Sequence, residues 1–325
     1  MRAVVCERLS EDFSGTAIRD VALPAAGPGE VLVQVRAAGI NFPDLLMCRG
    51  GYQLKPPPPF VPGMDVAGTV AAIGPEVTAF RFGDAVAGAA RYGSFAGFVK
   101  VPAGQLRPKP PGLSDTEAAA YQVAYLTAYV ALVRRAAMQP GETLLVHGAS
   151  GGTGMAAIGL GKALGARVIA TTGSPAKAAA LEAAGADHVL ETGDGFREPV
   201  KELTGGRGAD VIFDPVGGDV FDESVRCIAF DGRLLVIGFT SARIAEVATN
   251  MPLIKGFSVV GVRAGEYGRR FPDRGKENLD AIWALAREGK TRMPIHAELP
   301  LEDFRAGFAM LERREAVGRI VLKVS

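Results

Sequence analysis

Cysteine and clustered charge are both scarce in this chain of 325 residues. Its three cysteines, Cys6, Cys48 and Cys227, lie far apart without paired spacing, which favours a reduced, cytoplasmic protein. The formal net charge is +1 and no basic face is evident, so neither nucleic acid nor an anionic membrane is expected as a partner. Three short basic pairs are interpreted as solvated surface, namely Arg134-Arg135, Arg269-Arg270 and Arg313-Arg314.

Long apolar runs are also missing. The longest, Ala118 to Val133, contains Gln122 and Thr127 and is shorter than a bilayer span, so it predicts a buried helix and no membrane partner. The first residues, MRAVVCERL, are typical of a strand and lack the apolar region of a signal peptide, so none is expected. Internal repeats and low-complexity linkers are absent, and the length is sufficient for two sizeable cores.

The most informative stretch that is present surrounds a glycine-rich turn. An apolar strand leads into Ala149, Gly151, Gly152 and Gly154, and an apolar helix follows as far as Gly165. This is the G-x-G-x-x-G pattern of dinucleotide sites, in which alanine is tolerated at the first position. Its three small residues allow a tight turn, a close approach of the backbone to the dinucleotide, and contact between the helix and the sheet. The stretch therefore predicts a pyrophosphate bound at the N-terminus of the helix.

Alternating strand and helix patterns continue on the C-terminal side of the turn. Together with the opening strand before the turn they give six apolar strands with crossover segments between them, the number that a doubly wound parallel sheet needs. We therefore expect an α/β domain with the Rossmann fold. The six predicted strands are Thr143–Val146, Arg167–Thr172, His188–Leu190, Asp210–Asp214, Arg233–Ile237 and Ser258–Val262.

The flanks of this domain have a different pattern. Residues 1 to about 115 are rich in glycine and proline and carry short alternating segments, which is typical of a compact β domain. A terminal strand at Arg319–Val324 needs a host sheet, and the β-rich N-terminal part is the obvious one. We expect one domain formed by residues 1–120 together with 264–325, and a dinucleotide-binding domain formed by residues 121–263.

The end of the second strand indicates which dinucleotide binds. An acidic residue there would accept hydrogen bonds from the adenosine ribose of NADH. This chain instead has Thr172, Gly173 and Ser174, followed by Lys177. The missing acid removes repulsion against a 2′-phosphate, which a hydroxyl and an ammonium group can bind. The sequence therefore predicts NADPH, although Lys177 by itself would be an ordinary solvated helix lysine.

Several motifs along the whole chain resemble those of one known family. Together they are similar to the medium-chain dehydrogenases and reductases and, within them, to the zinc-independent quinone oxidoreductases such as zeta-crystallin. The resemblance implies a Rossmann domain inserted in a β-rich, GroES-like catalytic domain. The motifs are PGEVLV at 28–33, AAGINFPDLLMCRGGY at 37–52, PFVPGMDVAGTVAAIG at 59–74, the pair Gly83-Asp84, HGASGGTG at 147–154, GADHV at 185–189 and FDPVGG at 213–218.

The resemblance also bears on metal binding. Zinc-dependent relatives have ligands where this chain has Asn41, Met64 and, close by, Val123. An amide, a thioether and a valine cannot form a tetrahedral zinc site, so no metal is expected. His147 closes a buried strand and is expected to be packed or hydrogen-bonded rather than catalytic. Without a Lewis acid the expected acceptor is a quinone or another conjugated enone, onto whose oxygen the charge of an arriving hydride delocalises.

Site residues follow from the same resemblance. Asn41 and Tyr52 are expected beside the nicotinamide, Asn41 as an amide donor and Tyr52 as a phenol or a simple cleft wall. Asp44 is either catalytic or a helix N-terminal residue stabilised by the helix dipole. The expected cofactor-binding residues are Asn41, Thr127, Gly151, Gly152, Thr153, Gly154, Thr172, Gly173, Ser174, Lys177, Thr192, Gly217, Gly238, Phe239 and Thr240.

Two positions depart from the family pattern. Thr192, after Glu191, replaces a tyrosine near the adenosine phosphate, which removes a donor and adds a nearby carboxylate. The preference for NADPH is therefore expected to be less sharp than in relatives. Gly159 replaces a glutamine in the helix after the glycine turn, and nothing in the sequence explains that change.

Three functions remain open at this point. The favoured one is an NADPH-dependent quinone reductase that transfers a hydride to its small-molecule substrate. The second is reduction of the C=C bond of 2-alkenals, 2-alkenones or enoyl thioesters, for which Arg263 could attract an anionic acceptor. The third is an NADPH-binding structural or regulatory protein. The family also implies a homodimer through the edge strand Ser258–Val262.

Overall fold

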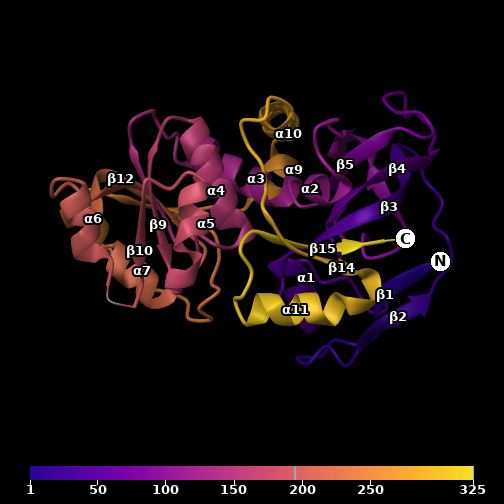
Figure 1. The fold of residues 1–325 in the computed structure, drawn as a ribbon, viewed down its shortest axis with the longest axis horizontal. Helices are drawn as coiled ribbons and strands as arrows, with labels where there is room; N and C mark the ends of the chain where they lie inside the picture. The colour runs from indigo at the N-terminus through magenta and orange to yellow at the C-terminus, as the bar shows by residue number, and fades with distance from the viewer. Residues whose placement is uncertain (194, 325) are drawn as a thin grey trace. The chain divides into compact units, whose positions relative to one another are not determined.

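The computed structural model describes residues 1–193 and 195–324, and Figure 1 shows its elements along the chain. Two compact units are present: unit 1 comprises Met1–Val123 and Met293–Ser325, and unit 2 comprises Ala124–Arg292. Residues 264–292 therefore group with unit 2, whereas the sequence places them with the first domain. One reason is Arg134, whose guanidinium donates to both Glu277 and Asn278 at 2.7 Å.

Unit 1 is built on a seven-stranded sheet with the order β14-β15-β3-β4-β5-β7, in which β6 also pairs with β3. The last strand runs antiparallel to β3, with Ile320 opposite Ile40, so the predicted host of the terminal strand is confirmed. The strands are β3 (Glu30–Ile40), β4 (Asp65–Ile73), β5 (Ala85–Ala89), β6 (Phe98–Pro102), β7 (Leu106–Pro108), β14 (Ile295–Pro300) and β15 (Arg319–Lys323).

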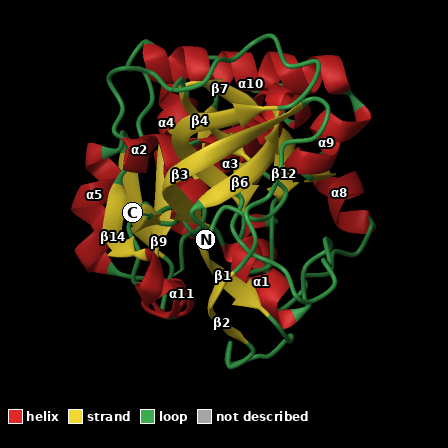
Figure 2. Cartoon of the chain, turned by 90° about the vertical axis from the view of Figure 1, so that its right-hand side faces the viewer, coloured by secondary structure: helices red, strands yellow, loops and turns green. Residues whose placement is uncertain are grey.

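A two-stranded sheet of β1 (Arg2–Cys6) and β2 (Thr16–Asp20) lies beside α1 (Phe42–Arg49) (Figure 2). Helix α1 begins at a capping box, because the Asp44 carboxylate accepts a hydrogen bond from the Asn41 backbone N–H at 2.8 Å. It ends at Gly50, whose φ of 79° suits glycine. The other helical segments of unit 1 are η1 (Ala103–Gln105), α2 (Asp115–Ala119), η4 (Leu301–Asp303) and α11 (Phe304–Glu312).

Unit 2 contains the expected parallel sheet, with the strand order β10-β9-β8-β11-β12-β13. The order reverses beside β8, as in a doubly wound Rossmann sheet, and all six predicted strands are confirmed. The strands are β8 (Thr143–Val146), β9 (Arg167–Thr172), β10 (His188–Glu191), β11 (Ala209–Asp214), β12 (Ile228–Val236) and β13 (Ser258–Gly261).

Helices cover this sheet and bury its strands. Strand β8 is buried along its whole length, as expected of a central parallel strand. On one face Leu145, Ile169 and Ile212 form a core with Phe196 and Phe221 of the covering segments. The helical segments of unit 2 are α4 (Gly152–Ala163), η3 (Pro175–Lys177), α5 (Ala178–Ala183), α6 (Arg197–Leu203), α7 (Gly218–Ser224), α8 (Asn250–Lys255), α9 (Ala264–Arg270) and α10 (Pro272–Arg287).

The apolar stretch Ala118 to Val133 is not one helix, which corrects the expectation from its sequence. It comprises the end of α2, then α3 (Gln122–Tyr129), and then a π-helical segment, η2 (Val130–Arg135). A physical cause lies at the start of α3, where the Asp65 carboxylate accepts a hydrogen bond from the Val123 N–H at 3.0 Å. A carboxylate at this position satisfies a backbone donor that a new helix leaves unpaired.

His147, at the end of β8, is a structural residue. It is fully buried, with Nδ1 2.8 Å from the Thr171 hydroxyl and Nε2 2.8 Å from the Ser224 hydroxyl. Because Ser224 donates its own hydrogen to the Val220 carbonyl at 2.6 Å, Nε2 carries the imidazole proton and donates to Ser224. Burial lowers the pKa of His147 from 6.5 to about 3, so the ring stays neutral and joins β8, β9 and α7.

We predict that His147 makes the stability of the protein depend on pH. Its folded pKa lies below its unfolded pKa, so the stabilisation is complete above about pH 6.5 and is lost as the pH falls toward 3. Between pH 6.5 and 5, the unfolding free energy of the wild type should fall more steeply than that of His147→Gln, by up to about 1.4 kcal/mol per pH unit. Urea denaturation at each pH measures this difference, and parallel curves would contradict it.

Candidate functional site

The glycine turn has the geometry that a bound pyrophosphate needs. A Cβ on Gly154 would lie 2.5 Å from the Gly148 carbonyl oxygen and 2.7 Å from the Ala149 Cα, so no side chain fits there. The first hydrogen bond within α4 is donated by Met155 to Gly151. The amides of Gly152, Thr153 and Gly154 therefore precede the helical bonding pattern and are available to an anion. The residues present fit a dinucleotide.

The residues expected around the adenosine ribose also come together. Lys177 Nζ lies 3.4 Å from the Ser150 hydroxyl of the glycine turn. The Thr172 hydroxyl accepts a hydrogen bond from the Ser174 N–H at 3.2 Å, and Thr192 donates to the Thr172 carbonyl at 3.4 Å. Gly173 lies between them, because a Cβ there would be 3.6 Å from the Thr192 hydroxyl. The cluster presents hydroxyls and an ammonium group at one end of the sheet.

A second group of expected residues follows β11 and β12. The buried Asp214 carboxylate accepts hydrogen bonds from the Val216 and Gly217 amides at 2.8 and 2.9 Å. Burial raises the pKa of Asp214, and these amides oppose the rise. The Thr240 backbone N–H donates to the Pro215 carbonyl, and a Cβ on Gly217 would lie 3.1 Å from the Phe239 ring. The structure thus gathers Gly217, Gly238, Phe239 and Thr240 at the carboxyl ends of these strands, while Thr127 lies on α3.

Gly159 has a structural explanation that its sequence context did not supply. A Cβ on this glycine would lie 2.8 Å from the hydroxyl oxygen of Tyr125. Tyr125 is fully buried and donates a hydrogen bond to the Arg292 carbonyl at 2.8 Å. The absence of a side chain at Gly159 therefore leaves room for a phenol that joins the beginning of unit 2 to its end.

In unit 1, Asn41 and Asp44 meet at the junction of β3 and α1. The Asn41 amide is buried, and its Nδ2 donates to the Gly39 carbonyl at 3.2 Å and to the Asp65 carboxylate at 3.1 Å. Its Oδ1 accepts a hydrogen bond from Arg319 at 2.6 Å. Both amide hydrogens are therefore already bonded within unit 1. A substrate oxygen would have to replace one of these two acceptors.

Asp44 and Tyr52 differ in their surroundings. Asp44 is fully buried as the third residue of α1, and burial raises its pKa to about 7. Its bond to the Asn41 N–H gives it the helix-capping position that was one of its two interpretations. Tyr52 follows α1 and is partly buried against the core of unit 1.

A buried ion pair lies beside Asn41 and Val123, two of the positions where zinc-dependent relatives have ligands. Arg319 donates to the Asp65 carboxylate at 2.6 Å, and both side chains are almost fully buried. Arg319 lies 254 residues from its partner, and no sequence motif pointed to it. Among residues 1–193 and 195–324, no group of three or more histidine, cysteine or acidic side chains is arranged to hold a metal ion.

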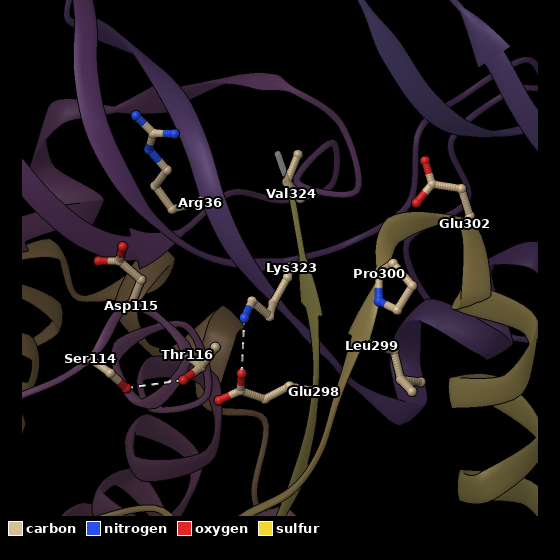
Figure 3. Close-up of a pocket in the computed structure, with 10 residues that line it drawn as sticks. All are labelled: Arg36, Ser114, Asp115, Thr116, Glu298, Leu299, Pro300, Glu302, Lys323 and Val324. Atoms are coloured by element: carbon tan, nitrogen blue, oxygen red, sulfur yellow. Dashed lines mark hydrogen bonds and ion pairs between the residues drawn. The ribbon is translucent and has the colours of Figure 1, made fainter.

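Unit 1 also carries an open groove of about 750 Å³ (Figure 3). Its charges largely pair with one another or with neighbours: Lys323 lies 3.5 Å from Glu298, and Asp115 pairs with Lys109 at 2.8 Å. The groove contains no predicted cofactor-binding or catalytic residue. The lining residues are Arg36, Ser114, Asp115, Thr116, Glu298, Leu299, Pro300, Glu302, Lys323 and Val324.

None of the helices in the described ranges has both the length and the apolar character required to cross a bilayer.

Comparisons with known proteins agree with this architecture. The family model described as alcohol dehydrogenase GroES-like domain matches residues 27–111, and the model described as zinc-binding dehydrogenase matches residues 152–282. The first falls in unit 1 and the second in unit 2. The expected combination of a GroES-like domain with a Rossmann domain is confirmed.

Similarity to individual proteins indicates which branch of the family this chain resembles. The chain is 36% identical over 325 residues to quinone oxidoreductase-like protein 2 of Mus musculus, covering 99% of this chain and 92% of that protein. It is 29% identical to the structure of mycobacterial Rv1454c complexed with NADPH, with a TM-score of 0.92 and coverage of 99% and 100%. It is 33% identical over 304 residues to phthioceranic/hydroxyphthioceranic acid synthase of Mycobacterium tuberculosis, covering 92% of this chain but 14% of that protein.

The glycine cradle and the overall similarity lead to the same assignment. The chain belongs to the quinone oxidoreductase-like family of the medium-chain dehydrogenases and reductases, and it is an oxidoreductase that uses a nicotinamide cofactor.

Proposed function

We propose that this protein is an NADPH-dependent quinone reductase that works without a metal. The observation that carries the proposal is the donor set at the zinc-ligand positions, where Asn41 is bonded to a buried Asp65–Arg319 pair. An amide held by a guanidinium offers no ligand set for a Lewis acid, which favours an acceptor that needs none. The similarity to a structure solved with NADPH supports the choice of cofactor.

The proposed reaction relies on positioning. NADPH supplies a hydride, which together with one proton converts a quinone to a hydroquinone and leaves NADP⁺. The amides of Gly152, Thr153 and Gly154 would hold the pyrophosphate, and the loop that contains Phe239 and Thr240 would hold the ribose and nicotinamide. Such sites accelerate hydride transfer mainly by holding donor and acceptor roughly 3 to 3.5 Å apart and excluding water.

Three residues of unit 1 have different roles in this proposal. Tyr52 borders the acceptor and offers its phenol as a donor. Asn41 presents its amide with a fixed orientation, because Arg319 bonds to the oxygen and Asp65 to the nitrogen. Asp44 acts as a positioning residue through the Asn41 backbone N–H. The three buried, free cysteines are consistent with a cytoplasmic location, which is part of the proposal.

We predict NADPH oxidation with quinones when the purified protein is mixed with NADPH and either 1,4-benzoquinone or 9,10-phenanthrenequinone. Absorbance at 340 nm follows the reaction, and prior treatment with a chelator should not change the rate. The proposal fails if neither quinone supports turnover although calorimetry detects tight NADPH binding. That outcome would favour a non-enzymatic NADPH-binding protein.

We further predict that Lys177 contributes to the preference for NADPH over NADH. Replacing it with alanine removes an ammonium group beside Ser150 that can bond to a 2′-phosphate. The KM for NADPH should rise about tenfold, equivalent to about 1.4 kcal/mol, while the KM for NADH stays unchanged. Lys201→Ala, which alters a surface lysine paired with Glu198, is the matched control. Equal changes for both cofactors would contradict this role.

A second candidate function is the reduction of enoyl thioesters. It is favoured by the 33% identity to a segment of an acid synthase. Synthesis of an acid from acyl units can include a step that reduces C=C bonds. The hydride would add to the β-carbon and a proton to the α-carbon. Oxidation of NADPH by crotonyl-CoA, in the same assay, tests this alternative.

We also propose a homodimer through β13. This strand pairs with β12 on one side only, and Val259 is 39% exposed on it. Other large apolar side chains are exposed on β12, which pairs with β13, and on α8, which precedes β13 in the chain. They are Phe230 on β12, 82% exposed, and Leu253 and Ile254 on α8, 81% and 72% exposed. An apolar edge of this kind favours pairing with a second copy.

Light scattering should therefore give about twice the chain mass of 33.9 kDa. Val259→Lys places a charge on the pairing edge and should yield a monomer. Phe82→Lys, which alters an exposed apolar side chain in unit 1, should remain dimeric. A monomeric wild type would refute the dimer.

A further inference from the structure

Positive charge is concentrated in one short segment of unit 2. Residues 263–276 contain five basic and two acidic residues, a net charge of +3 in a chain whose total is +1. The segment forms α9 and the start of α10, which lie side by side in Figure 1. A Cβ on Gly275 would lie 2.9 Å from the Gly268 Cα, so the two helices cross closely. We refer to Arg263, Arg269, Arg270 and Arg274 as the arginine cluster.

The charges of the arginine cluster exceed those of its partners. Arg269 and Arg270 both pair with the single carboxylate of Glu266 at 3.0 Å, and their side chains are 51% and 73% exposed. Arg263 also attracts the Glu266 carboxylate, so three guanidinium groups share this one acid, and Arg274 donates to the neutral Tyr267 phenol. An excess of exposed guanidinium groups is suited to a ligand with several phosphate charges.

An aromatic platform lies within the same cluster. The rings of Tyr267 and Phe271 are 5.2 Å apart, and the Arg274 guanidinium lies 5.4 Å from the centre of the Phe271 ring. Arg274 also donates to the Tyr267 hydroxyl at 3.1 Å, which holds the three side chains together. Phe271 is 48% exposed. A fixed, exposed ring flanked by guanidinium groups is suited to stacking against a purine base.

The cluster begins at the edge of the sheet where the dinucleotide turn lies. Strand β13 ends at Gly261, and Arg263 follows directly. Arg135 donates to the Gly261 carbonyl at 3.1 Å and fixes this end of the strand. Because β8 and β13 are parallel strands of one sheet, their carboxyl ends share an edge, and the glycine turn follows β8 there. A second nucleotide bound by the cluster would thus lie along the same edge as the cofactor.

We propose that the arginine cluster binds the nucleotide end of a coenzyme A thioester. The guanidinium groups of Arg263, Arg269 and Arg270 receive its phosphates, and the Phe271 ring stacks against its adenine. This inference rests on the second candidate function, the reduction of enoyl thioesters, and names the carrier of that substrate. An isolated adenosine bisphosphate shares this chemistry, so the experiment separates the nucleotide from the acyl part.

The test uses a double variant, Arg269→Gln with Arg270→Gln, and the matched control Arg313→Gln with Arg314→Gln, another surface basic pair. The KM for crotonyl-CoA should rise about tenfold in the first variant and stay unchanged in the control. The KM for crotonyl-N-acetylcysteamine, which lacks the nucleotide, should be unaffected by either. Circular dichroism and the Kd for NADPH verify that the variants are folded.

Binding of adenosine 3′,5′-bisphosphate is measured separately by calorimetry, with NADPH saturating so that the cofactor site is filled. It should bind the wild type, weaken as salt is raised, and bind the double variant about tenfold less tightly. If neither thioester is reduced but this binding behaves as expected, the second candidate function fails and the nucleotide site stands. The inference is overturned if the bisphosphate does not bind at millimolar concentration, or if crotonyl-CoA is reduced with a KM that the double variant leaves unchanged.

Discussion

The buried ion pair between Asp65 and Arg319 joins parts of unit 1 that are far apart in the sequence. It connects β4 with the terminal strand β15, and through Asn41 and Val123 it also reaches the end of β3 and the start of α3. Removing two charges from water is costly unless each is paired and hydrogen-bonded. Here Asp65 has three donors, so the pair specifies one arrangement of these strands.

This arrangement also limits the chemistry of unit 1. The guanidinium of Arg319 supplies the positive charge beside Asp65 and Asn41. It donates to the amide oxygen of Asn41, which is therefore not exposed. The Asp44 carboxylate accepts from the Asn41 backbone N–H and so lies at the same junction of β3 and α1. The proposed reaction therefore depends on alignment of two bound molecules, because the Asn41 amide already bonds to Gly39, Asp65 and Arg319.

The sequence predicted the parts of the fold that have a local signal. Parallel strands such as β8 are continuous apolar runs, and the turn at Gly154 admits only glycine, so both are readable over a few residues. The pairing of Arg319 with Asp65 has no such signal, since it joins residues 254 positions apart. The same holds for Gly159, whose partner Tyr125 lies on another helix, and for the interruption before α3 that Asp65 caps.

Charged side chains differ in burial and pairing between the two units. In unit 1 the charges of Asp65 and Arg319 are buried and paired, which fixes the structure around them. In unit 2 the arginines of α9 and α10 are exposed and exceed their acidic partners, so they are free to respond to an anionic ligand. The glycine turn acts through its backbone amides, so relatives with the same cofactor can share it. A change of charge on α9 or α10 would therefore alter an exposed surface without disturbing the buried pair of unit 1.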